Sequence, residues 1–266
     1  MRDPAHILEA EGITVQFGGV RAVAGVSLAI REGSITALIG PNGAGKTTFF
    51  NALTRLVQPT SGRLRFVAAE GEVELTTMPP DHIARAGIAR TFQNIRLFTD
   101  LSVLDNVKVG LHGRTRGGFW RALAGNRAEE QRLTGAALEY LDFVGLAQRE
   151  AEQSDSLSYG EQRKLEIARA LACGPRLLLL DEPAAGMNPQ ETQALVELIR
   201  RIRRAGVTIL LIEHDMKLVM RISDFVYVLD HGELIAQGEP ALVQKDARVI
   251  EAYLGPQYRP PAGEAN

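Results

Sequence analysis

The chain has 266 residues, 45% of them apolar, and a net charge of −2, which excludes global disorder and any general electrostatic attraction to nucleic acid or to an anionic bilayer. A single cysteine, Cys173, excludes an internal disulfide and favours a reducing compartment, and its apolar helical surroundings favour a small buried residue over a reactive thiol. The first twelve residues lack the apolar core of a secretory signal, and no apolar run approaches the roughly 20 residues that span a bilayer, so any membrane-embedded part should come from other chains.

Short strand-like runs occupy the beginning of the chain. They cover residues 7–17, 20–30 and 35–39 and are separated by glycine-containing turns. Residues 46–57 follow with apolar side chains at helical spacing, which predicts an amphipathic helix after the third strand. Together these runs predict a strand-loop-helix unit.

The middle of the chain, from about Leu101 to Ala172, has helical spacing and few β-branched runs, which predicts a helical lobe. Within it, residues 110–135 are rich in Gly and Arg and lack a clear period, so a long loop or a loosely helical hairpin is expected there. The Pro-rich, polar residues 256–266 are expected to be a disordered tail.

Strands and helices alternate after the middle region. Strands are predicted at 177–180, 207–212 and 225–229, with helices between them, and this alternation is typical of a parallel sheet with helices on its faces. The first of these helices should begin at Pro189, with Asn188 as its N-cap and Glu191 completing a capping box.

Residues 40–47 read GPNGAGKT and match G-x-x-x-x-G-K-[ST] between the strand that ends at Ile39 and the predicted helix. Glycines allow main-chain N–H groups to turn toward phosphates, Lys46 should reach the β and γ phosphates, and Thr47 should offer its hydroxyl to Mg²⁺. The alternative is a Gly-rich turn before a helix with no role in binding phosphate. Such a turn would not need to follow a strand. The predicted nucleotide-binding residues here are Gly40, Pro41, Asn42, Gly43, Ala44, Gly45, Lys46, Thr47 and Thr48.

A second motif follows the strand at 177–180. Asp181 and Glu182 stand at the carboxyl end of this strand, where ligands bind in open α/β sheets. Asp181 is placed to hold Mg²⁺, Glu182 is placed to accept a proton from the water that attacks the γ-phosphate, and Pro183 should keep Glu182 out of helical geometry. Taken alone, the two acids fit surface residues of a turn better than a metal site; the motif at 40–47 favours the metal site.

Residues 157–162 read LSYGEQ. Ser158 and Glu161 form a capping box at the start of a helix, and Ser158 with the N–H groups at Gly160 offers an anion site there. The hexapeptide resembles the LSGGQ signature of ABC ATPases. With the motifs at 40–48 and 177–182, Gln93 and His214, it completes the motif set of an ABC nucleotide-binding subunit.

The resemblance covers nearly the whole chain. Within the family, segments of this sequence resemble the ATP-binding subunits of branched-chain amino acid uptake systems; they are residues 90–98, 165–169, 181–186, 212–220 and 252–255. The resemblance implies an α/β fold, with a P-loop NTPase (RecA-like) core, an antiparallel β subdomain and an inserted α-helical subdomain. An ABC ATPase domain over 1–255, with its helical lobe at about 95–173, is therefore expected.

Three further roles rest on the resemblance alone. It implies that Phe17 stacks on adenine, that Gln93 contacts Mg²⁺ or the attacking water, and that His214 contacts the γ-phosphate. Without the family, these residues would be a core aromatic, a loop side chain and a polar residue after a strand. Two residues depart from the family pattern: Tyr159 replaces the first glycine of LSGGQ, and Asn188 stands where many members carry an aspartate.

The family mechanism implies two ATPase subunits, identical or different, that meet head to tail, so that Ser158 and Gly160 of one close over MgATP on the other. It also implies two membrane permeases, a solute-binding protein acting indirectly, no nucleic acid, and a cytoplasmic position on the inner face of the cell membrane. Ile95, Leu97 and Phe98 suggest a docking groove for a permease, or else pack into the helical lobe. Phe119, Trp120 and nearby arginines could touch lipid headgroups or form a solvated basic loop.

The leading hypothesis is an ATPase that energises an importer of branched-chain amino acids. The same machine could serve urea, short amides or other hydrophobic amino acids. A non-transport ABC ATPase of translation or DNA repair is a remote alternative, because such proteins usually carry two cassettes or a long coiled coil in one chain. Lipid export is disfavoured by the segment Arg90–Gln93.

Overall fold

The computed structural model describes residues 6–112 and 127–255 of the chain. The expectations for Phe119, Trp120 and the tail at 256–266 therefore lie outside the described residues. Among the helices that are described, none combines the length and the apolar composition needed to cross a bilayer.

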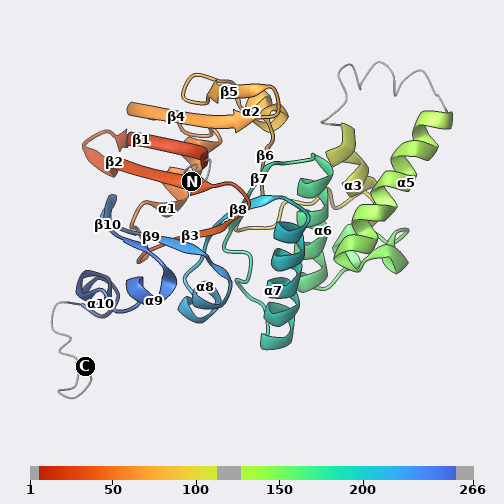
Figure 1. The fold of residues 1–266 in the computed structure, drawn as a ribbon. Helices are drawn as coiled ribbons and strands as arrows, with labels where there is room; N and C mark the ends of the chain where they lie inside the picture. Colours follow the sequence, from red (N-terminus) through yellow and green to blue (C-terminus); the bar gives the residue numbers. More distant parts are fainter. Residues whose placement is uncertain (1–5, 113–126, 256–266) are drawn as a thin grey trace, which may run out of the picture.

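An antiparallel sheet forms the upper layer of Figure 1, and its strands follow the order β2-β1-β4-β5. Its members are β1 (His6–Phe17), β2 (Val20–Arg31), β4 (Ser61–Ala68) and β5 (Gly71–Glu74). The long strands β1 and β2 pair from His6 opposite Arg31 to Phe17 opposite Val20, so the first hairpin ends beside Phe17.

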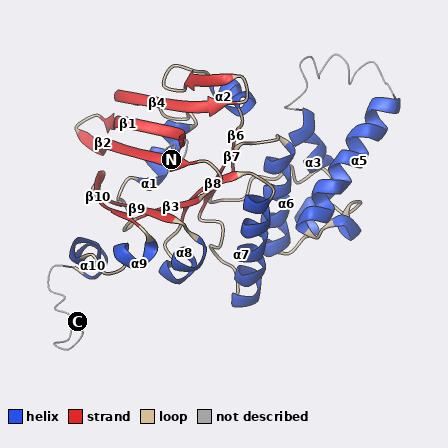
Figure 2. Cartoon of the chain, in the orientation of Figure 1, coloured by secondary structure: helices blue, strands red, loops and turns tan. Residues whose placement is uncertain are grey.

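A second sheet lies below the first, with the order β10-β9-β3-β8-β7-β6 (Figure 2). Its strands β3, β6, β7, β8 and β9 pair in parallel, and only β10 pairs antiparallel, with β9. The members are β3 (Ile35–Ile39), β6 (Ile88–Arg90), β7 (Leu177–Asp181), β8 (Thr208–Ile212), β9 (Phe225–Asp230) and β10 (Glu233–Gly238). The parallel pairing brings the carboxyl ends of β3, β7 and β8 to one edge.

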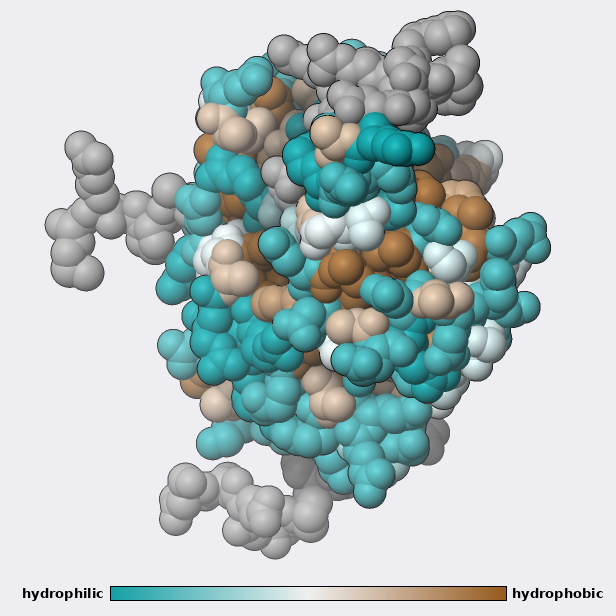
Figure 3. All heavy atoms as spheres, turned by 90° about the vertical axis from the view of Figure 1, so that its right-hand side faces the viewer, coloured by the Kyte–Doolittle hydropathy of each residue, from teal (hydrophilic) through white to brown (hydrophobic). Residues whose placement is uncertain are grey.

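Helices cover both faces of the parallel sheet. They are α1 (Lys46–Leu53), α2 (Pro80–Ala86), α3 (Val103–His112), α5 (Arg127–Val144), α6 (Tyr159–Ala172), α7 (Pro189–Arg204), α8 (Met216–Ile222), α9 (Pro240–Val243) and α10 (Ala247–Leu254), with short 3-10 turns at Ala147–Arg149 and Ser154–Ser156. In Figure 1, α3, α5 and α6 stand together on the right, away from the antiparallel sheet. Figure 3 views the molecule from that side, where apolar surface crosses a mostly hydrophilic face.

Side chains of the parallel strands alternate between two cores, as a sheet buried on both faces requires. Leu178 and Leu180 of β7 join the core shared with α3, α5, α6 and α7. Leu177 and Leu179 join the core that contains α1 and the antiparallel sheet. Both faces of β7 are therefore fully packed, which fixes the position of the two acids at its end.

The structure corrects one expectation drawn from the sequence and adds detail at two other places. The helix expected over 46–57 ends at Leu53, because Arg55 takes a positive φ of 57° and anchors its guanidinium on the Thr76 carbonyl; Leu56 is consequently 54% exposed. The stretch at 110–135 is helical at both described ends, since α3 reaches His112 and α5 begins at Arg127. The edge strand β6 was not predicted, because its three residues are too short to show a period.

Both predicted capping boxes are present. The Asn188 side chain accepts hydrogen bonds from the Gln190 and Glu191 amides at 2.9 and 3.0 Å, and Glu191 accepts in return from the Asn188 amide at 3.0 Å. The box of α6 joins Ser158 and Glu161 in the same manner, and its hydroxyl bond lowers the pKa of Glu161. These caps fix where the two helices begin.

Candidate functional site

The loop between β3 and α1 requires glycine at the predicted positions. Gly40, Gly43 and Gly45 have φ values of 150°, 82° and 98°. A Cβ on Gly40 would lie 2.0 Å from the Leu229 carbonyl oxygen, and one on Gly45 would lie 2.3 Å from that of Ala22, whereas a Cβ on Gly43 would meet nothing within 4 Å. The loop is thus packed on the protein side and open at Gly43, as a phosphate cradle requires.

Lys46 begins α1 and folds back over the loop that precedes it. Its Nζ donates to the carbonyl oxygens of Gly40 and Pro41 at 2.7 and 2.8 Å, and the residue is 6% exposed. Burial lowers the pKa of Lys46, while the negative charges of Glu182 and Asp181 oppose that shift. The cation and the two carboxylates therefore share one electrostatic environment at the sheet edge.

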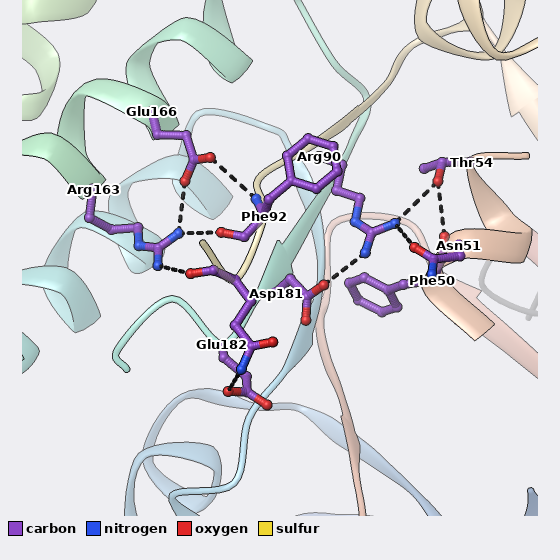
Figure 4. A network of polar contacts seen from close by, with 10 residues as sticks. Phe50, Asn51, Thr54, Arg90, Phe92, Arg163, Glu166, Asp181 and Glu182 are labelled. Atoms are coloured by element: carbon purple, nitrogen blue, oxygen red, sulfur yellow. Dashed lines mark hydrogen bonds and ion pairs between the residues drawn. The ribbon is translucent and has the colours of Figure 1, made fainter. Parts of the chain in front are cut away.

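Asp181 is held by a buried arginine that the sequence did not single out for a role. Its Oδ2 accepts from Nη2 of Arg90 at 2.8 Å, and both side chains are almost completely buried (Figure 4). Arg90 also donates to Asn51 on α1 at 2.8 Å and lies 5.5 Å from the centre of the Phe50 ring. The arginine thus ties β6, β7 and α1 together directly behind Asp181.

The second carboxylate oxygen of Asp181 fits a magnesium ion. Among the described residues, its Oδ1 is buried and has no hydrogen-bond partner, an arrangement that is costly unless a cation or water satisfies it. The described residues hold no cluster of three His, Cys, Asp or Glu that could bind a metal. Mg²⁺ suits such a place, because it commonly binds one or two carboxylates together with substrate phosphates and water.

Glu182 meets Gln93 and His214 beside Asp181. The Gln93 side-chain amide donates to Oε2 of Glu182 at 2.8 Å, and Nδ1 of His214 lies 3.8 Å from the same oxygen. Glu182 adopts a positive φ of 45° before Pro183, which is uncommon for a residue with a side chain. The backbone is therefore excluded from right-handed helical geometry, as expected, and occupies the left-handed region that strained functional residues often adopt.

Glu213 lies beneath this group and was missed by sequence reasoning. It is 1% exposed, accepts from the Ala184 and His214 amides at 3.0 and 3.2 Å, and has its pKa raised by burial. It thus joins the turn after Glu182 to the start of the His214 segment. Its position after β8 was visible in the sequence, but its burial was not.

The remaining predicted residues lie away from the Lys46 loop or are exposed. Phe17 is 52% exposed at the end of β1, so it is not a core aromatic. His214 is likewise more than half exposed. Ser158 and Gly160 line a hollow of about 340 Å³ together with the start of α7, and the described lining of this hollow contains no residue of the loop at 40–48.

A groove of about 600 Å³ opens between the parallel sheet and the helices α3 and α6. Leu97 is half-buried and packs against the helical core, whereas Phe98 is 50% exposed on the groove wall. Cys173, which closes α6, also lines this groove; it is partly buried and packs against the helical core, so it is less buried than expected.

Comparisons with known proteins agree with this geometry. The pattern of the family described as ABC transporter matches residues 23–185, and that described as branched-chain amino acid ATP-binding cassette transporter matches residues 233–255. This chain belongs to the ABC transporter family.

Curated members resemble the chain over almost its full length. A high-affinity branched-chain amino acid transport ATP-binding protein, BraF, of Pseudomonas aeruginosa is 46% identical over 94% of this chain and 98% of its own. LivG of Salmonella typhimurium, described as the same kind of protein, has the same identity and coverage, and LivG of Escherichia coli is 44% identical. The crystal structure of a nucleotide-free ATP-binding cassette from an ABC transporter superposes with a TM-score of 0.82 and 30% identity, covering 94% of this chain and 99% of that one.

As an ABC ATPase, this protein hydrolyses ATP and has the fold that the motifs implied. Sequence reasoning named the residues that face the open loop and the sheet edge. It did not assign roles to the buried charges behind them, Arg90, Glu213, Arg163 and Glu166, although three of these lie inside segments that carry the resemblance.

Proposed function

We propose that this ABC ATPase energises an importer of branched-chain amino acids. The observation that carries the catalytic part of the proposal is the group formed by Lys46, Asp181, Glu182 and Gln93 at one sheet edge. The substrate part is supported by the relatives, which are named for branched-chain amino acid transport, and by the C-terminal match at residues 233–255.

The chain's own residues divide the work of hydrolysis. The main chain of residues 40–48 and Lys46 would hold the phosphates, and Phe17 would offer its exposed ring to adenine. Asp181, Thr47 and Gln93 would hold Mg²⁺, which when bound neutralises charge on the phosphates. Glu182 would accept the proton of the attacking water, with Gln93 fixing its carboxylate and His214 close enough to contact the γ-phosphate.

The proposed partners are inferred from two surfaces of the chain, the hollow at Ser158 and Gly160 and the groove beside Phe98. Ser158 and Gly160 would close over ATP held by a second ATPase subunit, because the hollow that they line contains no residue of the phosphate loop. The groove beside Phe98 would receive one of two membrane permeases, since it is large and partly apolar. The subunit would then lie on the inner face of the cell membrane, where a solute-binding protein would act on it only through the permeases and nucleic acid would have no part.

Glu182→Gln tests the catalytic and transport proposals together. The amide keeps the shape of the side chain but is a far weaker base, so we expect ATP turnover to fall by about 10²-fold or more, while ATP binding persists. Cells that carry the variant in place of the native protein should then lose uptake of labelled leucine.

Labelled urea, measured in the same cells, separates the alternative substrate. Loss of urea uptake with normal leucine uptake would contradict the amino acid assignment. If purified Glu182→Gln hydrolyses ATP at the wild-type rate, Glu182 is not the base, whichever solute is carried.

A further inference from the structure

A buried ion pair lies on α6, directly after the LSYGEQ segment. Arg163 and Glu166 are 0% and 2% exposed, and Nη1 of the arginine is 2.8 Å from Oε2 of the glutamate. Burying two charges costs several kcal/mol per ion before their attraction is counted, and apolar residues of similar volume often stabilise such a place equally well. A pair of this kind therefore calls for an explanation beyond core packing.

Arg163 and Glu166 both form hydrogen bonds to the main chain of Phe92 (Figure 4), the residue before Gln93. Arg163 donates to the carbonyl oxygens of Phe92 and Gln93 at 2.6 and 2.8 Å. Glu166 accepts from the amides of Phe92 and Arg96, each at 3.3 Å. Consecutive peptide groups are thus fixed by side chains from one helix, and a guanidinium fork is well suited to hold two acceptors in a set geometry.

The segment held by Arg163 and Glu166 includes Gln93, which contacts Glu182. Gln93 donates from its side-chain amide to the Glu182 carboxylate at 2.8 Å, while its own carbonyl is held by Arg163. Neither Arg163 nor Glu166 reaches Glu182 in Figure 4, and Gln93 links the arginine to that carboxylate. The main-chain anchor and the side-chain contact belong to the same residue.

Tyr159, the departure from LSGGQ, belongs to this arrangement. Its hydroxyl lies 3.3 Å from Nη2 of Arg163, and its ring lies close to Gly186, where an added Cβ would meet the ring at 3.4 Å. Tyr159 therefore contacts both Arg163 and the segment that follows Glu182. A glycine at this position would offer no such contact.

We infer that Arg163 and Glu166 are positioning residues for ATP hydrolysis, which hold Gln93 so that its amide fixes Glu182. The inference rests on the proposed catalytic role of Glu182. Because Phe92, Arg96 and Glu166 also line the groove of about 600 Å³, an occupant of that groove would touch the same anchored segment. The pair on α6 thus lies beside the groove and is linked to the proposed base through Gln93.

The double variant Arg163→Met/Glu166→Leu tests the inference. It removes both charges together, so no uncompensated charge stays buried. We expect kcat to fall about 10- to 100-fold, the scale of loss when a positioned group shifts by about 1 Å. The KM for ATP should stay within about twofold, because the phosphate loop is untouched. Melting curves confirm that the variant is folded.

A matched control uses a second arginine with the same kind of contacts. Arg176 donates to the carbonyl oxygens of Val67 and Ala68 and lies 2.5 Å from Glu32, and it precedes β7 at the end of the strand opposite Asp181. Arg176→Met/Glu32→Leu should leave kcat unchanged. A second test variant, Arg163→Lys, keeps the charge beside Glu166 but cannot span two carbonyls, so a folded Arg163→Lys protein should also lose turnover.

Combination with Gln93→Ala decides whether the pair acts through Gln93. If it does, Arg163→Met/Glu166→Leu should lower kcat no further once Gln93 is alanine, since residues that act as a unit are not additive. Multiplied losses, or wild-type kcat in the folded Arg163→Lys protein, would overturn the inference. Normal turnover in Glu182→Gln would instead overturn the proposed base, so the two failures are distinguishable.

Discussion

Asp181 and Glu182 are neighbours in the sequence, but their surroundings differ. Asp181 is buried against Arg90, with one carboxylate oxygen left for a cation. Glu182 is partly exposed, accepts from the Gln93 amide at 2.8 Å and lies 3.8 Å from Nδ1 of His214. Different environments allow adjacent carboxylates to take different roles, one for a metal and one for a proton.

Glu213 gives a prediction about pH. Burial raises the pKa of this carboxyl, so the folded protein binds its proton more tightly than the unfolded chain does. The stabilisation by this proton is fully present below the ordinary glutamate pKa of about 4.3, and it is lost as pH rises through the folded pKa. Wild type should therefore lose stability relative to Glu213→Gln between pH 5 and pH 8.

Urea unfolding of both proteins at the two pH values measures this difference. Nδ1 of His214 lies 3.9 Å from the Glu213 carboxylate, so both proteins should carry His214→Gln, which removes this ionisable neighbour. Glu197→Gln, on an exposed part of α7, controls for the loss of a surface carboxylate. A gap between wild type and variant that does not change with pH would show that Glu213 keeps one protonation state.

Residue-scale prediction from the sequence succeeded where a motif fixes the backbone. The residues of 40–48 and the acids after β7 lie at the expected sheet edge, because glycine conformation and strand direction are local properties. Arg163 and Glu166 could not be predicted in this way. An i,i+3 pair of opposite charges on a helix usually lies in solvent, and only the tertiary contact with residues 92–96 shows that this one is buried.

At the scale of elements, α7 is the helix best specified by its own sequence. Its cap, its first-turn proline and its buried stripe all agree with the observed bounds Pro189–Arg204. The helix after the phosphate loop was overextended, because the left-handed turn at Arg55 depends on a distant anchor, the Thr76 carbonyl. Elements set by local chemistry were therefore predicted better than those ended by tertiary contacts.

Asn188→Ala tests the cap of α7. The change removes two hydrogen bonds, from Gln190 and Glu191, so we expect unfolding to become easier by about 1 kcal/mol. Asn188→Asp restores the family's more usual residue, keeps both acceptors and adds a favourable charge at the helix start, so its stability should match wild type. Urea midpoints report both; equal losses in the two variants would mean that the cap is not what stabilises this turn.

At the scale of the whole molecule, the two surfaces proposed to bind nucleotide do not meet within the described part of one chain. The phosphate loop opens beside β3, whereas Ser158 and Gly160 face a hollow between α6 and α7. The buried apolar residues of α1 belong to the core on one face of the parallel sheet, and those of α6 belong to the core on its other face. Two copies arranged head to tail would bring each surface to the other, so we expect dimerisation to depend on ATP.

ATP-dependent assembly can be measured with Glu182→Gln, in which bound ATP should persist. Light scattering after size exclusion should show dimers with MgATP and monomers without it. Adding Ser158→Ala removes a hydroxyl that would contact the partner's nucleotide. A hydrogen bond to a charged group contributes about 1.5–3 kcal/mol, and two such sites would form per dimer. We therefore expect monomers to dominate in this double variant. ATP binding to each monomer should remain, since Ser158 does not belong to that monomer's phosphate loop.

Asp246→Ala provides the control for lost helix capping in this experiment. Asp246 caps α10 by accepting from the Arg248 amide at 2.9 Å, just as Ser158 caps α6, so both changes cost one cap. We expect Glu182→Gln/Asp246→Ala to dimerise with ATP as the parent does. If Glu182→Gln/Ser158→Ala forms dimers equally well, the hollow beside α6 is not the second half of the site, and each chain must complete its nucleotide site from other residues.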